Sequence, residues 1–118
     1  CIMFERLSVL AERLDKVRNQ PLAEEATKTA LILPFIRELG YDIFDPTEVI
    51  PEFTADVGIK KGEKVDYAIC SDGLPIILFE CKPIGAKLDS YSSQLYRYFS
   101  TTKARIAILT DGIVYRFY

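Results

Sequence analysis

The sequence predicts an α/β domain in which a central mixed sheet is flanked by helices. Three observations lead to this fold class. Two early segments are rich in apolar residues at helical spacing, two pairs of apolar runs each meet at an Asp-Gly turn, and a helical segment separates those pairs. With 118 residues the chain can build one core. We therefore expect a single domain over 1–118, with an N-terminal helix over 1–19 and a core over 21–118.

Apolar spacing predicts the helices. Residues 3–19 carry an amphipathic stripe, which consists of Phe4, Leu7, Leu10, Leu14 and Val17. A second helix is expected from near Pro21, a residue favoured in a first helical turn, to Gly40, a natural stop. Pro34 should bend this helix. A third helix is expected over 89–101.

The strands are predicted from β-branched and aromatic runs bounded by turns. A short irregular strand is expected over 47–53, where proline interrupts the run. "EKVDYAIC" (63–70) and "LPIILFECK" (74–82) form a hairpin across Ser71-Asp72-Gly73. A second hairpin over 103–118 turns at Asp111-Gly112. The element order is therefore helix, helix, strand, hairpin, helix, hairpin.

Composition narrows the chemistry. The chain has no histidine, which excludes Ser-His-Asp and Cys-His catalysis by its own residues. Three cysteines without a CxxC pair argue against a cysteine zinc site. Acid–base or metal chemistry would rest on carboxylates, lysine, tyrosine and backbone oxygens, a ligand set that suits magnesium or manganese. A net charge of −2 gives no general attraction to nucleic acid.

Targeting signals are absent from the sequence as given. Its apolar runs are too short to span a bilayer, and it shows no signal-peptide pattern, so we expect a cytoplasmic protein that does not enter the membrane. The first residue is Cys rather than Met, and the last residues read as an unfinished strand. We therefore expect the chain to be part of a longer polypeptide.

Charged residues at the end of the 74–82 strand raise the functional question. Glu80 and Lys82 share one face of that strand, because residues two apart point to the same side. The register of the hairpin decides whether Asp66 joins them. A two-residue Asp72-Gly73 turn would leave Asp66 on the other face. A three-residue loop would pair Cys70 with Leu74 and bring Asp66 diagonal to Glu80, and we predict this register.

Two carboxylates so close together would repel one another unless a cation lay between them. A divalent metal would remove this conflict, with the backbone carbonyl of Cys81 and waters as further ligands. Lys82 would then orient or deprotonate an attacking water, or neutralise charge on a phosphate. The alternative is an ordinary surface pair of Glu80 and Lys82 beside a solvated Asp66.

The helix over 89–101 carries a second group of candidates. Tyr91, Gln94 and Tyr98 form one stripe, because they are spaced three and four residues apart. Gln94 and Tyr98 could support a metal-bound water or contact a nucleic-acid backbone. The alternative is a half-buried stripe that packs beside a core face of Leu88, Leu95 and Phe99.

The order Asp66, Glu80-x-Lys82 and Gln94-x-x-x-Tyr98 resembles the PD-(D/E)XK nuclease superfamily, with the helical signature of its RecB-like branch. The segments "EEATKTALILPFIRELGYDIFDPTEVIPEF", "KVDYAI" and "IILFECK" more closely resemble the N-terminal nuclease domain of type I restriction enzyme R subunits and related small prophage proteins. This resemblance runs over 22–118. Val65 stands where the motif has its proline, and nothing resembles an ATP-driven motor.

The resemblance implies a restriction-endonuclease-like core and roles for single residues. Asp66 and Glu80 would bind Mg²⁺ or Mn²⁺, Lys82 would serve the attacking water, and Gln94 and Tyr98 would support the site. A helix glutamate often joins the metal site in this superfamily, and Glu25 is preferred here over Glu24.

The expected function is metal-dependent endonuclease cleavage of DNA, with further domains or restriction-system subunits as additional partners. Phosphate contacts would come from five basic residues: Lys60, Lys61, Lys64, Lys87 and Arg97. One alternative is a non-catalytic nucleic-acid-binding or accessory module with an idle nuclease fold. Another is a docking or homo-oligomerisation domain, suggested by the apolar first helix and by Tyr115, Phe117 and Tyr118 at a sheet edge.

Overall fold

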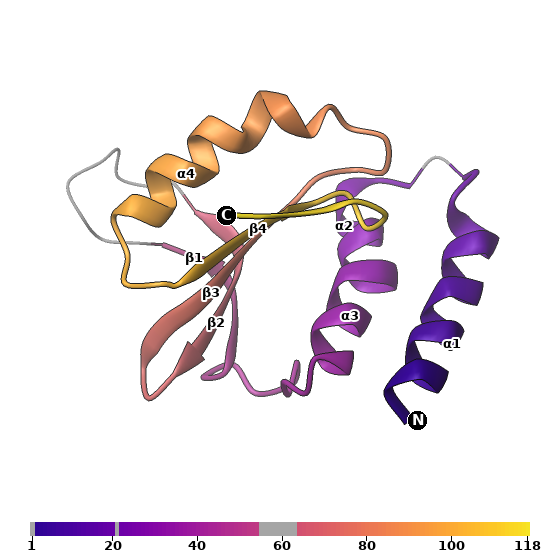
Figure 1. The fold of residues 1–118 in the computed structure, drawn as a ribbon, viewed down its shortest axis with the longest axis horizontal. Coiled ribbons are helices and arrows are strands. Elements are labelled where there is room, and N and C mark those ends of the chain that lie inside the picture. Colours follow the sequence, from indigo (N-terminus) through magenta and orange to yellow (C-terminus); the bar gives the residue numbers. More distant parts are fainter. Residues whose placement is uncertain (1, 21, 55–63) are drawn as a thin grey trace.

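The structure has the predicted α/β fold class. The computed structural model describes residues 2–20, 22–54 and 64–118, and within them five strands form one mixed sheet with helices on both faces (Figure 1). Strands lie in chain order, and neighbours are antiparallel except for the parallel pair β3 and β4. Their bounds are β1 (Val49–Phe53), β2 (Val65–Ser71), β3 (Leu74–Cys81), β4 (Ile106–Thr110) and β5 (Tyr115–Phe117).

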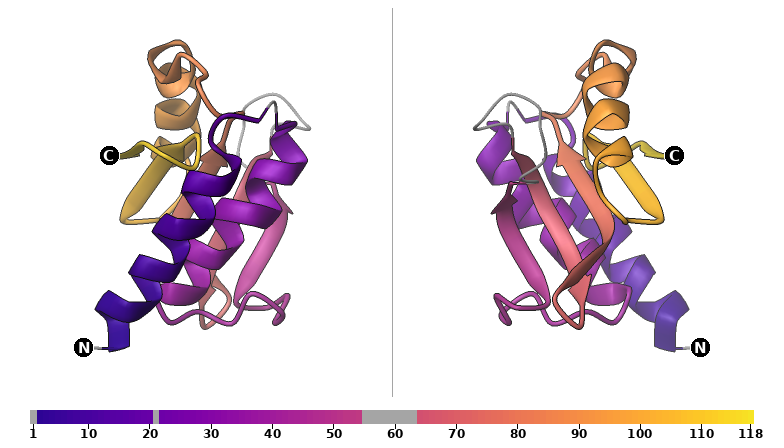
Figure 2. Two further views of the ribbon diagram at one scale, coloured as in Figure 1. Left: turned by 90° about the vertical axis from the view of Figure 1, so that its right-hand side faces the viewer. Right: turned by 90° about the vertical axis from the view of Figure 1, so that its left-hand side faces the viewer.

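The helices form two groups. On one face, α2 (Glu24–Thr27), the π-helical segment η1 (Lys28–Ile32) and α3 (Leu33–Glu38) follow one another as a continuous helix. On the other face, the 3₁₀ segment η2 (Leu88–Tyr91) and α4 (Ser92–Ser100) connect β3 to β4 and so permit their parallel pairing. The first helix, α1 (Ile2–Val17), packs outside η1 and α3 (Figure 2).

A wide helical turn precedes Pro34, where the sequence predicts a bend. The N–H group of Leu33 donates to the carbonyl of Lys28, five residues earlier. Proline has no N–H group, and its ring clashes with the carbonyl four residues before it in an α-helix. The π-helical segment just before Pro34 relieves that clash without ending the helix. The helix begins at Glu24 in the structure, and the predicted start at Pro21 lies outside the described residues.

The sheet divides the hydrophobic core into two layers. The layer under α4 contains Val65, Ala68, Cys70, Leu78, Leu88, Leu95, Tyr98, Ala104, Ala107 and Leu109. The layer under η1 and α3 contains Ile32, Ile36, Val49, Tyr67, Ile69, Phe79, Cys81 and Ile108. Asp66 lies in β2 between Val65 of the first layer and Tyr67 of the second, and Glu80 lies in β3 between Phe79 and Cys81 of the second. The two polar residues therefore stand at the end of the sheet, where the two apolar layers stop.

The predicted three-residue loop of the first hairpin is wrong. Ser71 pairs with Leu74, so only Asp72 and Gly73 form the turn. Their φ angles are 52° and 79°, and positive values at both central residues are those of the type I′ turn that Asp-Gly favours. Cys70 therefore pairs with Pro75 rather than with Leu74.

A bulge in β3 restores the face that the turn alone would have changed. Cys70 pairs with Pro75 but Ile69 pairs with Ile77, so Ile76 is an extra residue in β3. Pro75 has no N–H group to donate to a cross-strand hydrogen bond, so interrupting the pairing at this point costs little free energy. Beyond the bulge Ala68, rather than the predicted Asp66, lies opposite Leu78.

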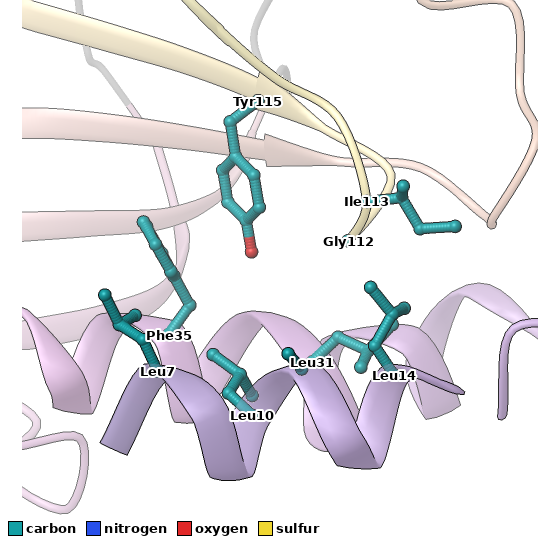
Figure 3. A pocket seen from close by; sticks show the side chains of 9 residues that line it. Leu7, Leu10, Leu14, Leu31, Phe35, Gly112, Ile113 and Tyr115 are labelled. Atoms are coloured by element: carbon teal, nitrogen blue, oxygen red, sulfur yellow. The ribbon is translucent and has the colours of Figure 1, made fainter. Parts of the chain in front are cut away.

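An apolar pocket lies beside the N-terminal helix. Its volume is about 180 Å³, and it is bounded by α1, η1, α3 and the turn between β4 and β5 (Figure 3). Its lining comprises Leu7, Leu10, Ala11, Leu14, Leu31, Phe35, Gly112, Ile113 and Tyr115. Gly112 has a φ of 91°, and a Cβ there would lie 2.8 Å from Cδ1 of Leu31. This close approach explains the glycine of the second Asp-Gly turn.

Within the ranges that the structure describes, no helix combines the length and the apolar character needed to cross a membrane.

Candidate active site

Two carboxyl groups meet at one end of the sheet. Asp66 is the second residue of β2 and Glu80 the last but one of β3, so each is the neighbour of one member of the cross-strand pair Tyr67 and Phe79. The Glu80 side chain is hydrogen-bonded to Asp66, and Glu80 is only 9% exposed. Oδ2 of Asp66 also accepts a hydrogen bond of 2.7 Å from the backbone N–H of Cys81. The structure thus brings together the two residues on which the metal hypothesis depends.

A lysine that the sequence reasoning missed lies at the same place. Nζ of Lys28 is 2.7 Å from Oδ1 of Asp66 and 2.8 Å from Oε1 of Glu25. The Lys28 side chain is 9% exposed, whereas that of Glu25 is 82% exposed. Lys28 is the first residue of η1, so it reaches Asp66 from the continuous helix formed by α2, η1 and α3. Its spacing from Glu25 is that of an ordinary helical ion pair, and no sequence signal indicated its contact with Asp66.

The two carboxyl groups have different protonation states, one an anion and the other a neutral acid. Burial, reinforced by the hydrogen bond to Asp66 and by its charge, raises the pKa of Glu80 to about 9. Burial alone would also raise the pKa of Asp66, but the hydrogen bonds from Glu80, Lys28 and Cys81 outweigh it and lower that pKa. Without a metal at neutral pH, Asp66 is therefore ionised and Glu80 carries a proton.

The charge of Lys28 is stabilised by its two partners. Burial acts to lower the pKa of Lys28, but hydrogen bonds and charge interactions with Asp66 and Glu25 outweigh it and raise the pKa. Lys28 is therefore a cation next to the ionised Asp66. It supplies positive charge beside the carboxyl pair, between Asp66 and Glu25.

Lys82 lies just beyond the end of β3. Its N–H group donates to the carbonyl of Thr110, which extends the parallel pairing of β3 with β4 by one residue. Nζ of Lys82 lies 4.2 Å from the centre of the Tyr91 ring, a cation–π contact. The charge of Lys82 acts to lower the pKa of Glu80, so the two side chains interact electrostatically. Lys82 thus stays close to the carboxyl pair while a tyrosine from η2 restrains it.

The two other catalytic candidates lie in different environments on α4. Gln94 is exposed. Tyr98 is 5% exposed within the core layer under α4, and its hydroxyl donates a hydrogen bond of 3.1 Å to the carbonyl of Phe53 in β1. The structure therefore places Tyr98 as a link between α4 and the edge strand.

The basic candidates are distributed over the surface. Lys64 is exposed and lies 3.8 Å from Glu52. Lys87 and Arg97 are exposed, on the loop before η2 and on α4 respectively. Lys60 and Lys61 lie outside the described residues.

The sequence profile of one protein family matches residues 57–118, more than half of the chain. That family is described as the type I restriction enzyme R protein N terminus. The chain belongs to this family. Comparison with curated proteins and with solved structures finds no match.

The segment matched to the type I R protein N terminus runs from before β2 to the end of β5 and contains Asp66, Glu80 and Lys82. It does not include α2 or η1. Glu25 and Lys28 therefore join the carboxyl pair from a part of the chain outside the matched segment.

The donor chemistry at this end of the sheet fits a hard divalent cation. Asp66 and Glu80 already share a hydrogen bond, and a cation could replace the proton that allows them to lie together. Among the described residues, no three Cys, Asp or Glu side chains gather closely enough to hold a metal ion. Further ligands would have to be backbone oxygens such as that of Cys81, or water.

The two neighbouring helix glutamates relate differently to this pair. Glu25, the one preferred from the sequence, binds Lys28. Glu24 is half-buried, and its charge contributes to the raised pKa of Glu80. The helix thus brings negative charge close to Glu80 through Glu24, while Glu25 is bonded to Lys28.

Proposed function

We propose that this chain is a metal-dependent DNA endonuclease domain with a restriction-endonuclease-like core of the PD-(D/E)XK kind. The observation that carries the proposal is the direct contact of Asp66 with Glu80 at adjacent strand ends, with Lys82 two residues further along. Membership of the type I R protein N-terminus family supports the link to restriction. Further subunits of a restriction system are accordingly proposed as partners.

In this proposal Asp66, Glu80 and the carbonyl of Cys81 would hold Mg²⁺ or Mn²⁺. The bound ion would polarise a phosphate and make a coordinated water more acidic. Hydrolysis joins the oxygen of water to phosphorus and breaks one ester P–O bond. Lys82, restrained over the Tyr91 ring, would donate hydrogen bonds to a phosphate oxygen or orient the attacking water.

The remaining candidates have supporting roles in the proposal. Gln94 is exposed on α4 and could reach the nucleic-acid backbone, whereas Tyr98 would act through the packing of α4 on β1. Phosphate contacts are proposed for Lys60, Lys61, Lys64, Lys87 and Arg97. Such contacts would make DNA binding weaken as the salt concentration rises.

Plasmid nicking in the presence of Mg²⁺ or Mn²⁺ tests the proposal. We expect the wild-type chain to convert supercoiled plasmid to open circles, and Glu80→Ala and Lys82→Ala each to slow this at least a hundredfold. Exposed residues of the same types provide matched controls, Glu12→Ala and Lys103→Ala. Equal nicking by wild type and by both site variants would remove the assigned roles.

A second candidate function is a non-catalytic DNA-binding or accessory module. It is favoured by the finding that Lys28 and the proton on Glu80 already compensate the charge of the carboxyl pair without a metal. This candidate predicts salt-sensitive DNA binding together with no cleavage under any metal condition. Nicking that requires Glu80 would reject it.

A further inference from the structure

The ammonium group of Lys28 lies between two carboxylates, at a position that a cation fits. Its Nζ atom lies between Oδ1 of Asp66 and Oε1 of Glu25, at 2.7 Å and 2.8 Å. One partner belongs to the sheet and the other to the helix, one turn before Lys28 itself. The ammonium group therefore ties η1 to the first residues of β2 and sits where two carboxylates converge.

The carboxylate of Asp66 has three polar partners. Oδ1 binds Lys28, Oδ2 accepts the N–H of Cys81, and the carboxylate is also hydrogen-bonded to Glu80. A metal ion shared with Glu80 would replace a proton on that side of Asp66. A second ion, between Asp66 and Glu25, would have to displace a buried lysine with two charged partners, which is costly.

We propose that Lys28 is a positioning residue that holds Asp66 in place and substitutes for a second metal ion, so that the site binds a single divalent cation. This inference rests on the proposed metal site. It assigns to Lys28 the charge compensation that a second cation provides in two-metal phosphodiesterases. Asp66 and Glu25 would converge on a fixed internal cation, which does not dissociate as a metal ion can.

Removing the charge of Lys28 should therefore create a metal site. Lys28→Met keeps much of the length of the side chain but leaves Asp66 and Glu25 facing each other without a cation. Manganese binding is measured by isothermal titration and by the electron paramagnetic resonance of free Mn²⁺. We expect Lys28→Met to bind one more Mn²⁺ ion per chain than wild type, and Lys28→Arg to bind the same number as wild type.

Two controls separate this effect from general changes. The double variant Lys28→Met/Glu25→Gln should lose the additional ion, because one of its two carboxylates is gone. Lys64→Met removes the lysine of an exposed pair, in which Nζ lies 3.8 Å from Glu52, and should gain no ion because Glu52 stays solvated. A purely structural role of Lys28 would lower stability in Lys28→Met without adding a metal ion.

Each outcome bears on Lys28 independently of catalysis. A gain of one ion beyond the single ion of wild type supports the inference even if wild type nicks no DNA, a result that would defeat only the proposed function. No gain of an ion in Lys28→Met overturns the inference. Wild type that binds no Mn²⁺ overturns it as well, because Lys28 would then not stand in for a second ion. If Lys28→Met is unfolded without metal, near-ultraviolet circular dichroism follows a titration with Mn²⁺. Recovery in Lys28→Met that is absent from Lys28→Met/Glu25→Gln supports the inference, because only the additional ion needs Glu25. Equal recovery in both variants, or no recovery in either, overturns it.

Discussion

Replacing Glu80 by glutamine should stabilise the metal-free protein at neutral pH. The buried carboxyl of Glu80 has a pKa of about 9 in the folded chain, against an ordinary value of 4.5. At pH 7 the unfolded chain therefore gains stability from ionising Glu80, whereas the folded chain keeps it protonated. Glutamine cannot ionise in either state, and its amide can still donate a hydrogen bond to Asp66.

The size of the effect follows from the pKa difference. Because the folded-state pKa is raised, the titration of Glu80 costs no stability below pH 4.5, and the cost grows as the pH rises toward 9. At about 1.4 kcal/mol per pH unit, the interval from 4.5 to 7 corresponds to about 3 kcal/mol. For a chain of this size that is roughly 10 °C in melting temperature.

Thermal and urea unfolding in the presence of a chelator measure this difference between wild type and Glu80→Gln. We expect the variant to be more stable at pH 7 and more so at pH 8, and the two proteins to converge near pH 4. Glu12→Gln, an exposed change of the same kind, is the matched control and should leave stability unchanged at every pH. A difference that is absent at pH 8, or that does not change with pH, would refute the assigned protonation of Glu80.

Three further predictions concern packing and metal binding. Gly112→Ala should lower the free energy of unfolding by about 1–3 kcal/mol, since its Cβ would lie 2.8 Å from Leu31 at a φ of 91°, and an unchanged urea midpoint would contradict this. Tyr98→Phe should cost about 1 kcal/mol through the lost hydrogen bond to Phe53, and a variant as stable as wild type would show that this bond contributes nothing. Mn²⁺ affinity, measured by isothermal titration, should increase between pH 6 and pH 8 because Glu80 must release its proton, and a pH-independent affinity would argue against Glu80 as a ligand.

The sequence predicted the layered fold because its signals are local. Apolar spacing, two Asp-Gly turns and the helix between the hairpins specify the element order, and the structure shows that order as a mixed sheet with helices on both faces. The irregular strand predicted over 47–53 is also present as β1, with Pro51 on an edge strand. Each of these features depends on neighbouring residues, which the sequence displays directly.

The register of the first hairpin could not be predicted from the turn alone. The Asp-Gly turn and the bulge at Ile76 each shift the register by one residue relative to the prediction. The total shift of two residues leaves the same residues of β2 and β3 on a shared face, such as Ala68 and Leu78. Pro75 was a visible signal for such a bulge, because it removes a ladder donor. The contact of Asp66 with Glu80 therefore agrees with the hypothesis although the predicted loop does not.

Lys28 shows what a sequence cannot display. Its contact with Asp66 joins residues 38 positions apart and depends on how the helix packs against the sheet. The wide turn before Pro34 is part of that packing, and η1 begins at Lys28 itself. The sequence indicated acidic residues on this helix as candidates, yet the buried group that reaches Asp66 is basic.

An anomalous-scattering map from a crystal soaked in Mn²⁺ tests whether Asp66 and Glu80 share a metal ion. We expect one manganese peak in contact with carboxylate oxygens of Asp66 and Glu80, with Lys28 still bound to Asp66. No peak at these residues, with Asp66 and Glu80 still hydrogen-bonded to each other, would contradict this expectation.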